Sequence, residues 1–352
     1  MQEQETDSFR WSVSCGMLAF GKLAGVPLHR LFQEAEAIIE AYSVGAPRAR
    51  DLFGPEVGVG GPMWAGISYG HTNALGCELR FPEDSEVGVR PLYGTLDEGI
   101  EALQEKVDFA QRGMIPFYLN LWEELKQAFP DRRIPFGGLA AEGPITTAWI
   151  LRGHDFFSDL YDAPEQTQRF LRLVTDSVVE YKNWMASVNG QPGFSTDGAG
   201  VCDDVAAMIS PTLWPHFVMP YLERYFRAVT SGRRSAHIED LTVQHLPFLD
   251  ELELTSFDPS VSPRLTPALF RDHCSVSFSW RLNAMQLRDL NEAQIKSWVR
   301  DAARDGAASV FYNIEAVGCT DEGAAKVKAF IRAAKHVQQR LTQGHSRAEL
   351  AS

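Results

Sequence analysis

The sequence predicts an α/β protein built as a single (β/α)8 TIM barrel with an N-terminal helical extension. Two observations predict this fold. Short strand-like runs alternate with helical segments from about residue 134 onward, and the motifs GxGxxG and GxxxxGK[ST] of nucleotide-binding doubly wound folds do not occur. The length of 352 residues allows either two domains or one large barrel. The regular alternation favours one barrel at residues 61–345, preceded by a helical cover at residues 1–60.

Helices are indicated by apolar residues at helical spacing and by capping residues. Leu31, Ala35 and Ile38 indicate helix in the N-terminal cover. Thr95 and Glu98 form a capping box, which predicts a helix that ends near Gly113. Later helices are predicted at residues 162–190, 210–232, 241–249, 267–272, 292–304 and 324–341.

Strands are predicted from short apolar or β-branched runs between these helices. The legible ones lie at residues 134–140, 193–196, 235–239, 254–257, 276–280 and 309–314. One or two less legible strands are expected before residue 134. Because strands and helices alternate, we expect a parallel sheet with helices outside it.

Composition and charge exclude several classes of protein. The formal net charge of −13 leaves no basic field for a nucleic acid or an anionic membrane surface. Residues 57–77 carry no charge, but their glycines and Pro62 argue for a loop or strand rather than a membrane span. Residues 1–10 are polar and lack a secretory signal, so we expect a cytoplasmic protein. The five cysteines are odd in number, widely spaced and free of any CxxC pair, so they indicate neither a disulfide framework nor a zinc ribbon.

A candidate metal site follows the predicted strand at 235–239. In a barrel the active site lies at the carboxyl ends of the strands, and residues two apart on a strand point to the same side. His237 and Glu239 can therefore converge, and Cys319 follows the last predicted strand. All three residue types are zinc ligands, and three protein ligands with one open position form a catalytic zinc site. The structural alternative is a hydrogen-bonded core histidine, a helix-capping glutamate and a small buried cysteine.

Other candidate residues also follow predicted strands. A glycine-containing loop carries three aspartates, Asp197, Asp203 and Asp204. Their carboxylates are candidates for binding a cation or serving as general base, and the structural alternative is a solvated acidic turn. Asp258 follows the predicted strand at 254–257. Arg281 follows the predicted strand at 276–280, where it either binds a substrate carboxylate or phosphate or lies on the surface. The uncharged stretch also contains a polar cluster, which either lines a pocket or packs over the barrel: Tyr69, His71, Asn73 and Cys77.

These segments together resemble the uroporphyrinogen decarboxylase superfamily, and within it the corrinoid- and coenzyme M-linked methyltransferases. The resemblance covers roughly residues 60 to 340 and is carried by short motifs in a fixed order. They are Gly143-Pro144-Ile145-Thr146 before Gly153, Asp162-Ala163-Pro164-Glu165 with Thr175-Asp176, Ile209-Ser210-Pro211-Thr212-Leu213-Trp214 before Pro220-Tyr221, His237, and Gly318-Cys319. It implies a (β/α)8 barrel with its pocket at the C-terminal mouth.

The resemblance also implies a zinc-dependent methyltransferase. In that branch zinc is held by a His-x-Cys pair and a distant cysteine. His237 and Cys319 match the first and third ligands, while Glu239 stands in place of the middle cysteine. Zinc would activate a thiol or folate acceptor, and the methyl group would come from a corrinoid on a separate protein, since no DxHxxG motif occurs here.

Two alternatives stay open. The first is a decarboxylase or other lyase on a small carboxylated substrate, with Arg281 or another cation binding the carboxylate and Asp197 or Asp203 handling the proton. Uroporphyrinogen itself is not expected, because the RQAGR-type motif of the true decarboxylases is absent before residue 100. The second is a non-catalytic corrinoid- or tetrapyrrole-binding protein.

Overall fold

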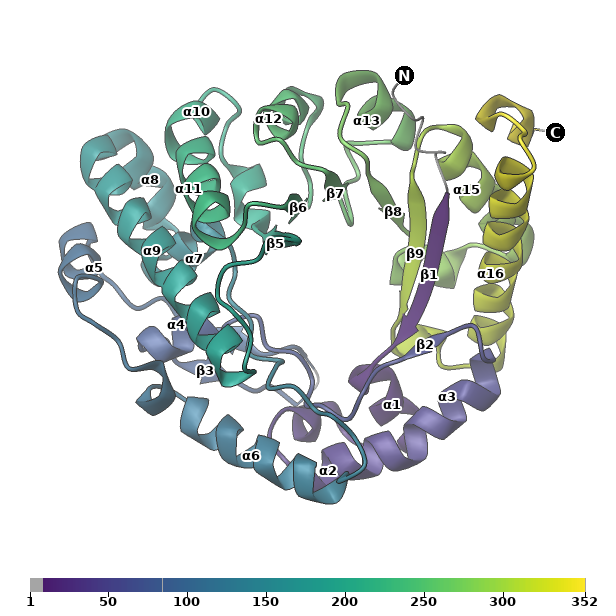
Figure 1. Cartoon of the computed structure of the whole chain (residues 1–352), viewed down its shortest axis with the longest axis horizontal. Coiled ribbons are helices and arrows are strands. Elements are labelled where there is room, and N and C mark those ends of the chain that lie inside the picture. Colours follow the sequence, from purple (N-terminus) through teal and green to yellow (C-terminus); the bar gives the residue numbers. More distant parts are fainter. Residues whose placement is uncertain (1–8, 84, 352) are drawn as a thin grey trace.

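The computed structural model describes residues 9–83 and 85–351, and these form a ring of helices around parallel strands. Figure 1 shows the strands toward the centre of the ring and the helices outside them. This arrangement confirms the predicted α/β barrel class.

The strands form two parallel ladders and one separate hairpin. The first ladder has the order β2 (Gly58–Val59), β1 (Arg10–Cys15), β9 (Ser309–Ile314) and β8 (Ser279–Arg281). The second contains β5 (Gly198–Cys202), β6 (Arg233–His237) and β7 (Ser256–Asp258). The hairpin pairs β3 (Leu79–Arg80) with β4 (Gly88–Val89).

Continuous strand pairing does not join the two ladders among the described residues, and only isolated contacts lie between them. A parallel bridge between Phe257 and Phe278 connects the second ladder to the start of β8. On the other side, Ile67 bridges to Leu139, and the Gly143 N–H donates to the Cys202 carbonyl at 2.5 Å. The predicted strand at 134–140 is therefore present only as this bridge, because Pro135, Gly137 and Gly138 do not sustain a ladder.

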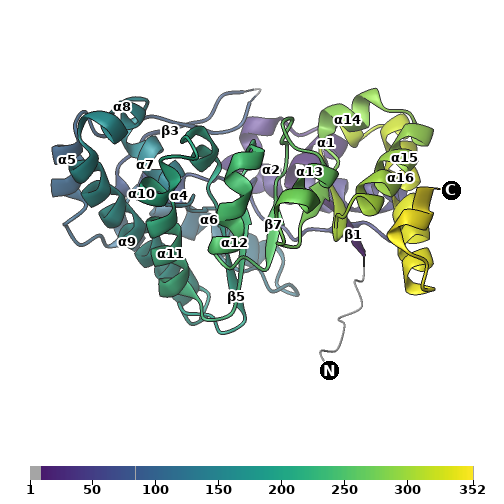
Figure 2. The ribbon, with the colours of Figure 1, turned by 90° about the horizontal axis from the view of Figure 1, so that it is seen from above.

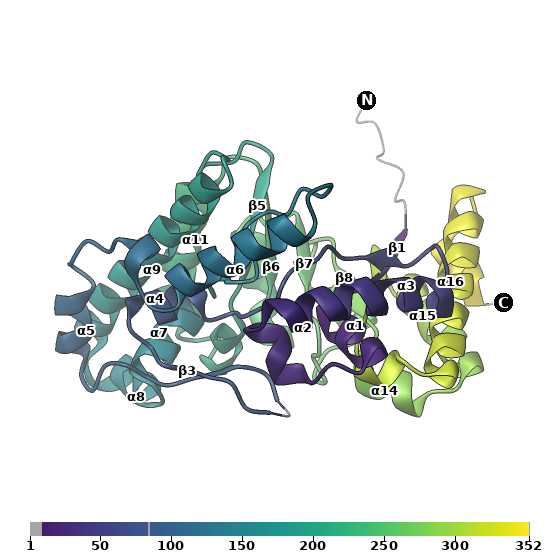
Figure 3. The same cartoon turned by 90° about the horizontal axis from the view of Figure 1, so that it is seen from below.

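Helices cover the outside of the strands in chain order. They are α1 (Met17–Ala24), α2 (Ala35–Glu40), α3 (Ala46–Phe53), α4 (Gly70–Leu75), α5 (Leu96–Ala102), α6 (Ile115–Ala128), α7 (Pro144–Arg152), α8 (Asp155–Asp162), α9 (Pro164–Val188), α10 (Trp214–Phe217), α11 (Met219–Val229), α12 (Leu246–Glu251), α13 (Pro267–His273), α14 (Ala284–Asp289), α15 (Glu292–Arg304) and α16 (Asp321–Thr342). Helices α9 and α11 lie side by side (Figure 2), and α2 contacts α6 (Figure 3). No helix in residues 9–83 and 85–351 is long and apolar enough to span a membrane.

The N-terminal segment departs from the expected helical cover. It contains α1, α2 and α3, but β1 precedes them and pairs with β9 from Arg10–Ser309 to Cys15–Ile314. The pattern of β1 explains this, because Val13 and Cys15 are buried against the helices while Ser12 and Ser14 are not. The described part of this segment, residues 9–60, therefore supplies a barrel strand as well as helices, and the domain boundary at residue 60 stays a prediction.

The predicted helix boundaries were partly right. The capping box is confirmed, since the Glu98 N–H donates to Thr95 Oγ1 at 3.2 Å and the Thr95 N–H donates to Glu98 Oε2 at 3.1 Å. That helix ends at Ala102, however, well before Gly113. The strand predicted at 193–196 lies instead at Gly198–Cys202, which moves residues expected in a loop into the barrel wall.

Candidate active site

The carboxyl ends of β5, β6 and β7 bring together an imidazole and three carboxylates. His237 ends β6 and Asp258 ends β7, and the two residues are partners in the parallel register. His237 Nδ1 lies 2.8 Å from Asp258 Oδ2. The other ring nitrogen, Nε2, lies 3.7 Å from Asp204 Oδ1 and 3.8 Å from Glu239 Oε1. Four residues singled out from the sequence thus form one cluster.

The electrostatics of this cluster favour a proton on His237. Burial opposes the charged imidazolium, yet the hydrogen bond and charge of Asp258, with the charges of Asp204 and Glu239, raise the pKa of His237 above its usual value. Burial also raises the pKa of Asp204, against the hydrogen bond from the Glu239 N–H at 2.9 Å. With Nδ1–H donating to Asp258, Nε2 is left to exchange a proton with a bound molecule.

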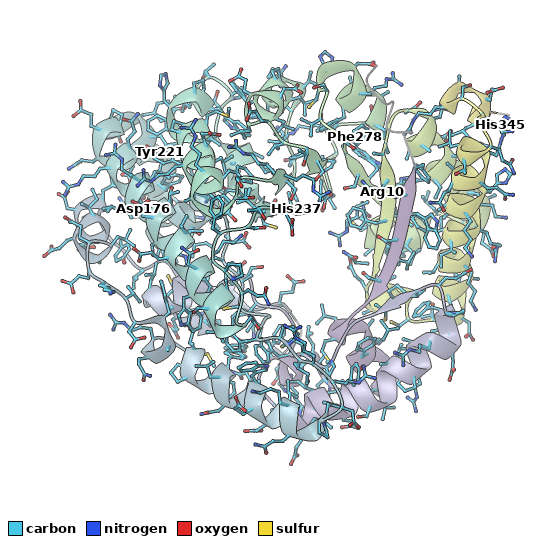
Figure 4. All side chains as sticks on the ribbon, in the orientation of Figure 1. Arg10, Asp176, Tyr221, His237, Phe278 and His345 are labelled. Atoms are coloured by element: carbon cyan, nitrogen blue, oxygen red, sulfur yellow. The ribbon has the colours of Figure 1, made fainter. Side chains whose placement is uncertain are left out.

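Two hollows lie near the end of β6. The first has a volume of about 420 Å³ and is lined by His237, Asp258, Cys202, Glu142 and Lys182, among others. Figure 4 labels His237 at the inner edge of the ring. The second, of about 1020 Å³, lies at the ends of β1, β8 and β9 and is lined by Glu239. Because His237 Nε2 is 3.8 Å from the Glu239 carboxylate, the two hollows adjoin at this pair.

Asp203 does not line the first hollow and instead binds the backbone at the start of α7. Its side chain is fully buried, and it accepts the N–H groups of Ile145 at 3.1 Å and Thr146 at 2.6 Å in the first turn of α7. Burial raises the pKa of Asp203 to about 7, although these hydrogen bonds oppose the shift. A Cβ atom on Gly143 would lie 2.5 Å from Asp203 Cγ, so only glycine fits beside it. We therefore assign Asp203 a structural role, the capping of the α7 N-terminus, in place of the expected catalytic role.

Asp197 lies far from the cluster. The predicted loop at 197–204 is largely strand β5, so Asp197 stands at its amino end, beside Arg233, whose N–H donates to the Asp197 carbonyl at 3.1 Å. Only Asp203 and Asp204 lie at the carboxyl end. Asp197 is therefore not part of the candidate site, because a five-residue strand separates the two ends of the predicted loop.

The polar cluster of the uncharged stretch is mostly core. His71 is fully buried, its Nε2 is 2.9 Å from Ser177 Oγ, and burial lowers its pKa to about 3. Asn73 donates to the Cys77 carbonyl at 2.9 Å and accepts the Met114 N–H at 2.7 Å. These bonds use both ends of the Asn73 amide, so the structural interpretation holds for His71 and Asn73. Tyr69 is half-buried, and burial and the charge of Glu142 raise its pKa.

A family model described as uroporphyrinogen decarboxylase (URO-D) matches residues 69–335 of this sequence. The chain belongs to the uroporphyrinogen decarboxylase family. Among solved structures, a methyltransferase from Methanosarcina mazei is similar over 94% of each chain, with a TM-score of 0.68 and 18% sequence identity. This likeness shows the shared fold, while the match to the family model confirms the superfamily indicated by the sequence motifs. No curated protein matches the chain.

In this uroporphyrinogen decarboxylase family member, Cys319 does not join His237 and Glu239. Its thiol faces the carbonyls of Glu315 at 3.6 Å and Ala19 at 3.8 Å, and burial raises its pKa to about 11. In the part of the chain that the structure describes, no group of three or more His, Cys, Asp or Glu side chains is arranged to hold a metal ion. The residues present therefore do not fit the predicted three-ligand zinc site.

Arg281 is already engaged by protein groups. Its guanidinium lies 2.9 Å from Glu315 Oε1 and 3.2 Å from Ser260 Oγ, and it lines the larger hollow. Its Nε is buried without a partner among the described residues. Arg281 thus belongs to the mouth of the family barrel, as expected, but a substrate anion would have to compete with Glu315 for it.

Sequence reasoning missed two residues of the smaller hollow. Burial raises the pKa of Glu142 to about 7, with the charge of Asp204 adding to the shift, and Glu142 Oε2 is buried without a partner among the described residues. Its signal was available, because it follows the predicted strand at 134–140 and precedes the Gly143-Pro144 motif. Lys182 had no signal, since it lies in the interior of the long helix α9.

Proposed function

We propose that this family member is a methyltransferase that moves a methyl group from a corrinoid on a partner protein to a thiol. His237, oriented by Asp258, would take the proton of the acceptor. The coarse assignment agrees with the family match and with the fold shared with a methyltransferase. The particular chemistry rests on the geometry at the end of β6.

The observation that carries the proposal is the pair of hollows that adjoin at His237 and Glu239. Methyl transfer needs two substrates at once, with the nucleophile in line with the methyl carbon and the leaving group. The 420 Å³ hollow has the size of a small-molecule site, and the 1020 Å³ hollow leaves room for a larger group. We place the acceptor thiol in the smaller one and the methyl donor in the larger.

The chemistry follows from His237. A free thiol has a pKa of about 8.5 and reacts as the thiolate. When the thiol proton passes to His237 Nε2, the resulting imidazolium is stabilised by Asp258 at 2.8 Å and by the carboxylates of Asp204 and Glu239. The thiolate then attacks the methyl carbon. A carbon–sulfur bond forms as the bond to the donor breaks, and the donor leaves with that electron pair. A folate acceptor would release its amine proton to the same nitrogen.

Zinc and the corrinoid partner remain predictions from the resemblance. The base proposed here needs no metal, and of the three predicted ligands only His237 and Glu239 lie close together, whereas the Cys319 thiol contacts the carbonyls of Ala19 and Glu315. The barrel and its covering helices account for the described residues, which is consistent with a corrinoid that arrives on another protein. The cytoplasmic location likewise stays a prediction from the sequence.

The direct test mixes the purified chain with methylcobalamin and a thiol and follows the absorbance change on demethylation together with the thioether product. We expect turnover that falls at least about 100-fold in His237→Ala, the lower end of the usual range for general acid–base catalysis. The control is Asp176→Asn, an exposed carboxylate paired with Arg224 at 2.6 Å and outside both hollows. Equal turnover in wild type and His237→Ala would refute the proposal. A spectral shift without product would indicate the non-catalytic binding protein instead.

One observation favours the second candidate, a carboxy-lyase. Glu142 lines the smaller hollow with a pKa near 7, so it can donate a proton to a carbanion left by decarboxylation. It would replace Asp203 and Asp197 in the predicted proton role. Release of CO2 from small carboxylic acids, abolished in Glu142→Gln and retained in His237→Ala, would favour this lyase over the methyltransferase.

A further inference from the structure

A basic groove lies on the outer wall of the barrel, between α15 and α16. The two helices contact each other, and Figure 1 shows them outside β9 and β1 at the right of the ring. The groove has a volume of about 280 Å³. Its basic lining residues are Lys296, Arg300, Arg332, His336 and Arg340, and its apolar ones are Ala333, Val337 and Leu350. These residues are distinct from those that line the two hollows of the candidate active site.

Helical spacing places the basic side chains in two rows. Lys296 and Arg300 are four residues apart on α15, and Arg332, His336 and Arg340 follow at the same spacing on α16. Residues four apart lie on one face of a helix, with a rise of about 6 Å between them. The row on α16 therefore extends over roughly 12 Å. Because both rows line the same groove, two helices present one sign of charge to the same space.

The two cations of α15 in this groove have no carboxylate partner in the part of the chain that the structure describes. Arg300 Nη2 donates to the Ser297 hydroxyl at 3.1 Å, and its Nε is buried without a partner. One turn further along α15, Arg304 lies outside the groove and pairs with Asp301 at 2.8 Å. Like charges four residues apart on a helix, as at Lys296 and Arg300, are destabilising. An anion bound between the rows would remove a repulsion that the fold leaves in place.

Two exposed carboxylates lie near the groove without neutralising it. Glu292 Oε2 is 3.1 Å from Arg332 Nη2, and about half of each side chain is exposed. Hydrogen bonds from Ser346 lower the pKa of Glu349, and the charge of Arg340 adds to this shift. Solvent screens such surface pairs, so they hold their cations only weakly. The groove therefore stays positive in a chain whose formal net charge is −13.

A buried apolar base lies under these charges. Val337 of α16 and Leu350 of the C-terminal segment η7 (Arg347–Ala351) line the groove, and both are almost fully buried. Segment η7 is attached to the barrel, because Arg347 donates to the Ala307 carbonyl at 2.9 Å. Walls of low dielectric constant focus the field of like charges in a cleft, which strengthens the attraction of an anion. The groove is thus a formed cleft rather than a set of scattered surface cations.

We propose that this groove binds a compact multivalent phosphate anion, namely the di- or triphosphate chain of a nucleotide or a free polyphosphate. A terminal phosphate group carries roughly 1.5 to 2 negative charges and three acceptor oxygens at pH 7. A chain of two or three phosphates therefore brings more negative charge into about 280 Å³ than the same number of carboxylates. Guanidinium groups such as those of Arg300, Arg332 and Arg340 bind phosphate through two parallel N–H donors. The site lies outside the barrel and is independent of the proposed methyl transfer.

Isothermal titration calorimetry of the full chain, without divalent metal, compares ATP, tripolyphosphate and adenosine. We expect ATP and tripolyphosphate to bind at one site per chain and at least about tenfold more tightly than adenosine. Their binding should weaken as salt rises from about 0.05 M to about 0.5 M, because salt screens these charges. Tighter binding of ATP than of tripolyphosphate would identify a nucleotide as the ligand, and equal binding a free polyphosphate. Equal binding of ATP and adenosine would overturn the proposal, as would a polyglutamate peptide that binds where both phosphates fail.

Variants locate the anion in the groove. Arg300→Gln should weaken ATP binding at least about tenfold, the effect of one charge-assisted contact. Lys296→Gln should weaken it in the same direction, and because Lys296 is exposed, circular dichroism and melting temperature should show an intact fold. The matched control is Arg304→Gln, which removes a cation of the same helix from outside the groove and should leave ATP binding unchanged. An equal loss in Arg304→Gln and Arg300→Gln would refute a specific site. Loss of ATP binding in His237→Ala but not in Arg300→Gln would place the anion in the barrel and also refute it.

Discussion

The hydrogen bond between His237 and Asp258 is the contact on which the proposed chemistry depends most, and Asp258→Asn removes its charge. The bond is 2.8 Å long and joins a carboxylate to an imidazole that becomes charged. Hydrogen bonds to charged groups contribute about 1.5–3 kcal/mol, and about 1.4 kcal/mol is a factor of ten. We therefore expect kcat/KM for thiol methylation to fall by about 10- to 100-fold.

The pH dependence distinguishes this role from a general disturbance. Only neutral His237 accepts a proton, so the rate of the wild type rises with pH through the pKa of His237. Asp258 raises that pKa, although burial alone would lower it. Its replacement by asparagine should therefore shift the acid limb of the kcat/KM profile to lower pH while lowering the plateau. A nuclear magnetic resonance titration of the His237 ring should show the same shift.

A double variant provides the decisive control, because Asp258 Oδ1 also accepts the Ser260 N–H at 2.8 Å. If Asp258 acts through His237, then Asp258→Asn should lower the rate of His237→Gln by less than about threefold. Asp176→Asn should leave rate and profile unchanged. The reasoning is refuted by an Asp258→Asn variant that keeps the wild-type acid limb, or by full additivity of the two substitutions.

Three further predictions concern stability and metal content. Asp203→Ala leaves the N–H groups of Ile145 and Thr146 without their acceptor. Urea denaturation should therefore show that the free energy of unfolding falls by about 2–4 kcal/mol. A loss below about 1 kcal/mol would contradict the capping role. In the folded chain the pKa values of Asp203 and Glu142 are both about 7, above those of carboxylic acids in an unfolded chain. Between about pH 4 and 7 the folded state therefore binds more protons than the unfolded state. The free energy of unfolding should fall as the pH rises through this range. The double variant Asp203→Asn/Glu142→Gln should flatten that decline, and an unchanged slope would argue against the shifts. Elemental analysis of the purified wild type should find well under one zinc ion per chain, and Cys319→Ser should have the same zinc content. One zinc ion per wild-type chain that is lost in Cys319→Ser would show that the predicted ligands do assemble.

The alternation of strands and helices was sufficient to predict the barrel, because each βα unit carries its own local pattern. The last strand was predicted with its exact bounds, 309–314. Strand β1 was missed, since its sequence, RWSVSC, alternates too briefly to stand out before a long helical segment. The strand at 134–140 was overestimated for the opposite reason: its apolar residues suggested a strand that Pro135 and its two glycines do not sustain.

The candidate site was predictable where a residue directly follows a strand. Asp258 was found in this way, His237 and Glu239 at the end of a predicted strand and Asp204 in the loop after another, and the structure brings the four together. The same reasoning placed Asp197 at the wrong end of β5, because a shift of a few residues in a strand boundary moves a side chain from the mouth to the base of the barrel. Lys182 could not be found at all, since its position in the hollow depends on how α9 packs against β5.

The sequence by itself determined the fold class, the family and the set of polar residues at the strand ends, because these depend on local periodicity and short motifs. Only the tertiary structure decided which of those residues meet. In the structure, Asp203 caps the N-terminus of α7, and the Cys319 thiol contacts the carbonyls of Ala19 and Glu315. A hollow lies inside the barrel between His237 and Arg10. The physical reason is that side chains from different strands converge only through register and packing, which link residues more than 200 positions apart in the chain.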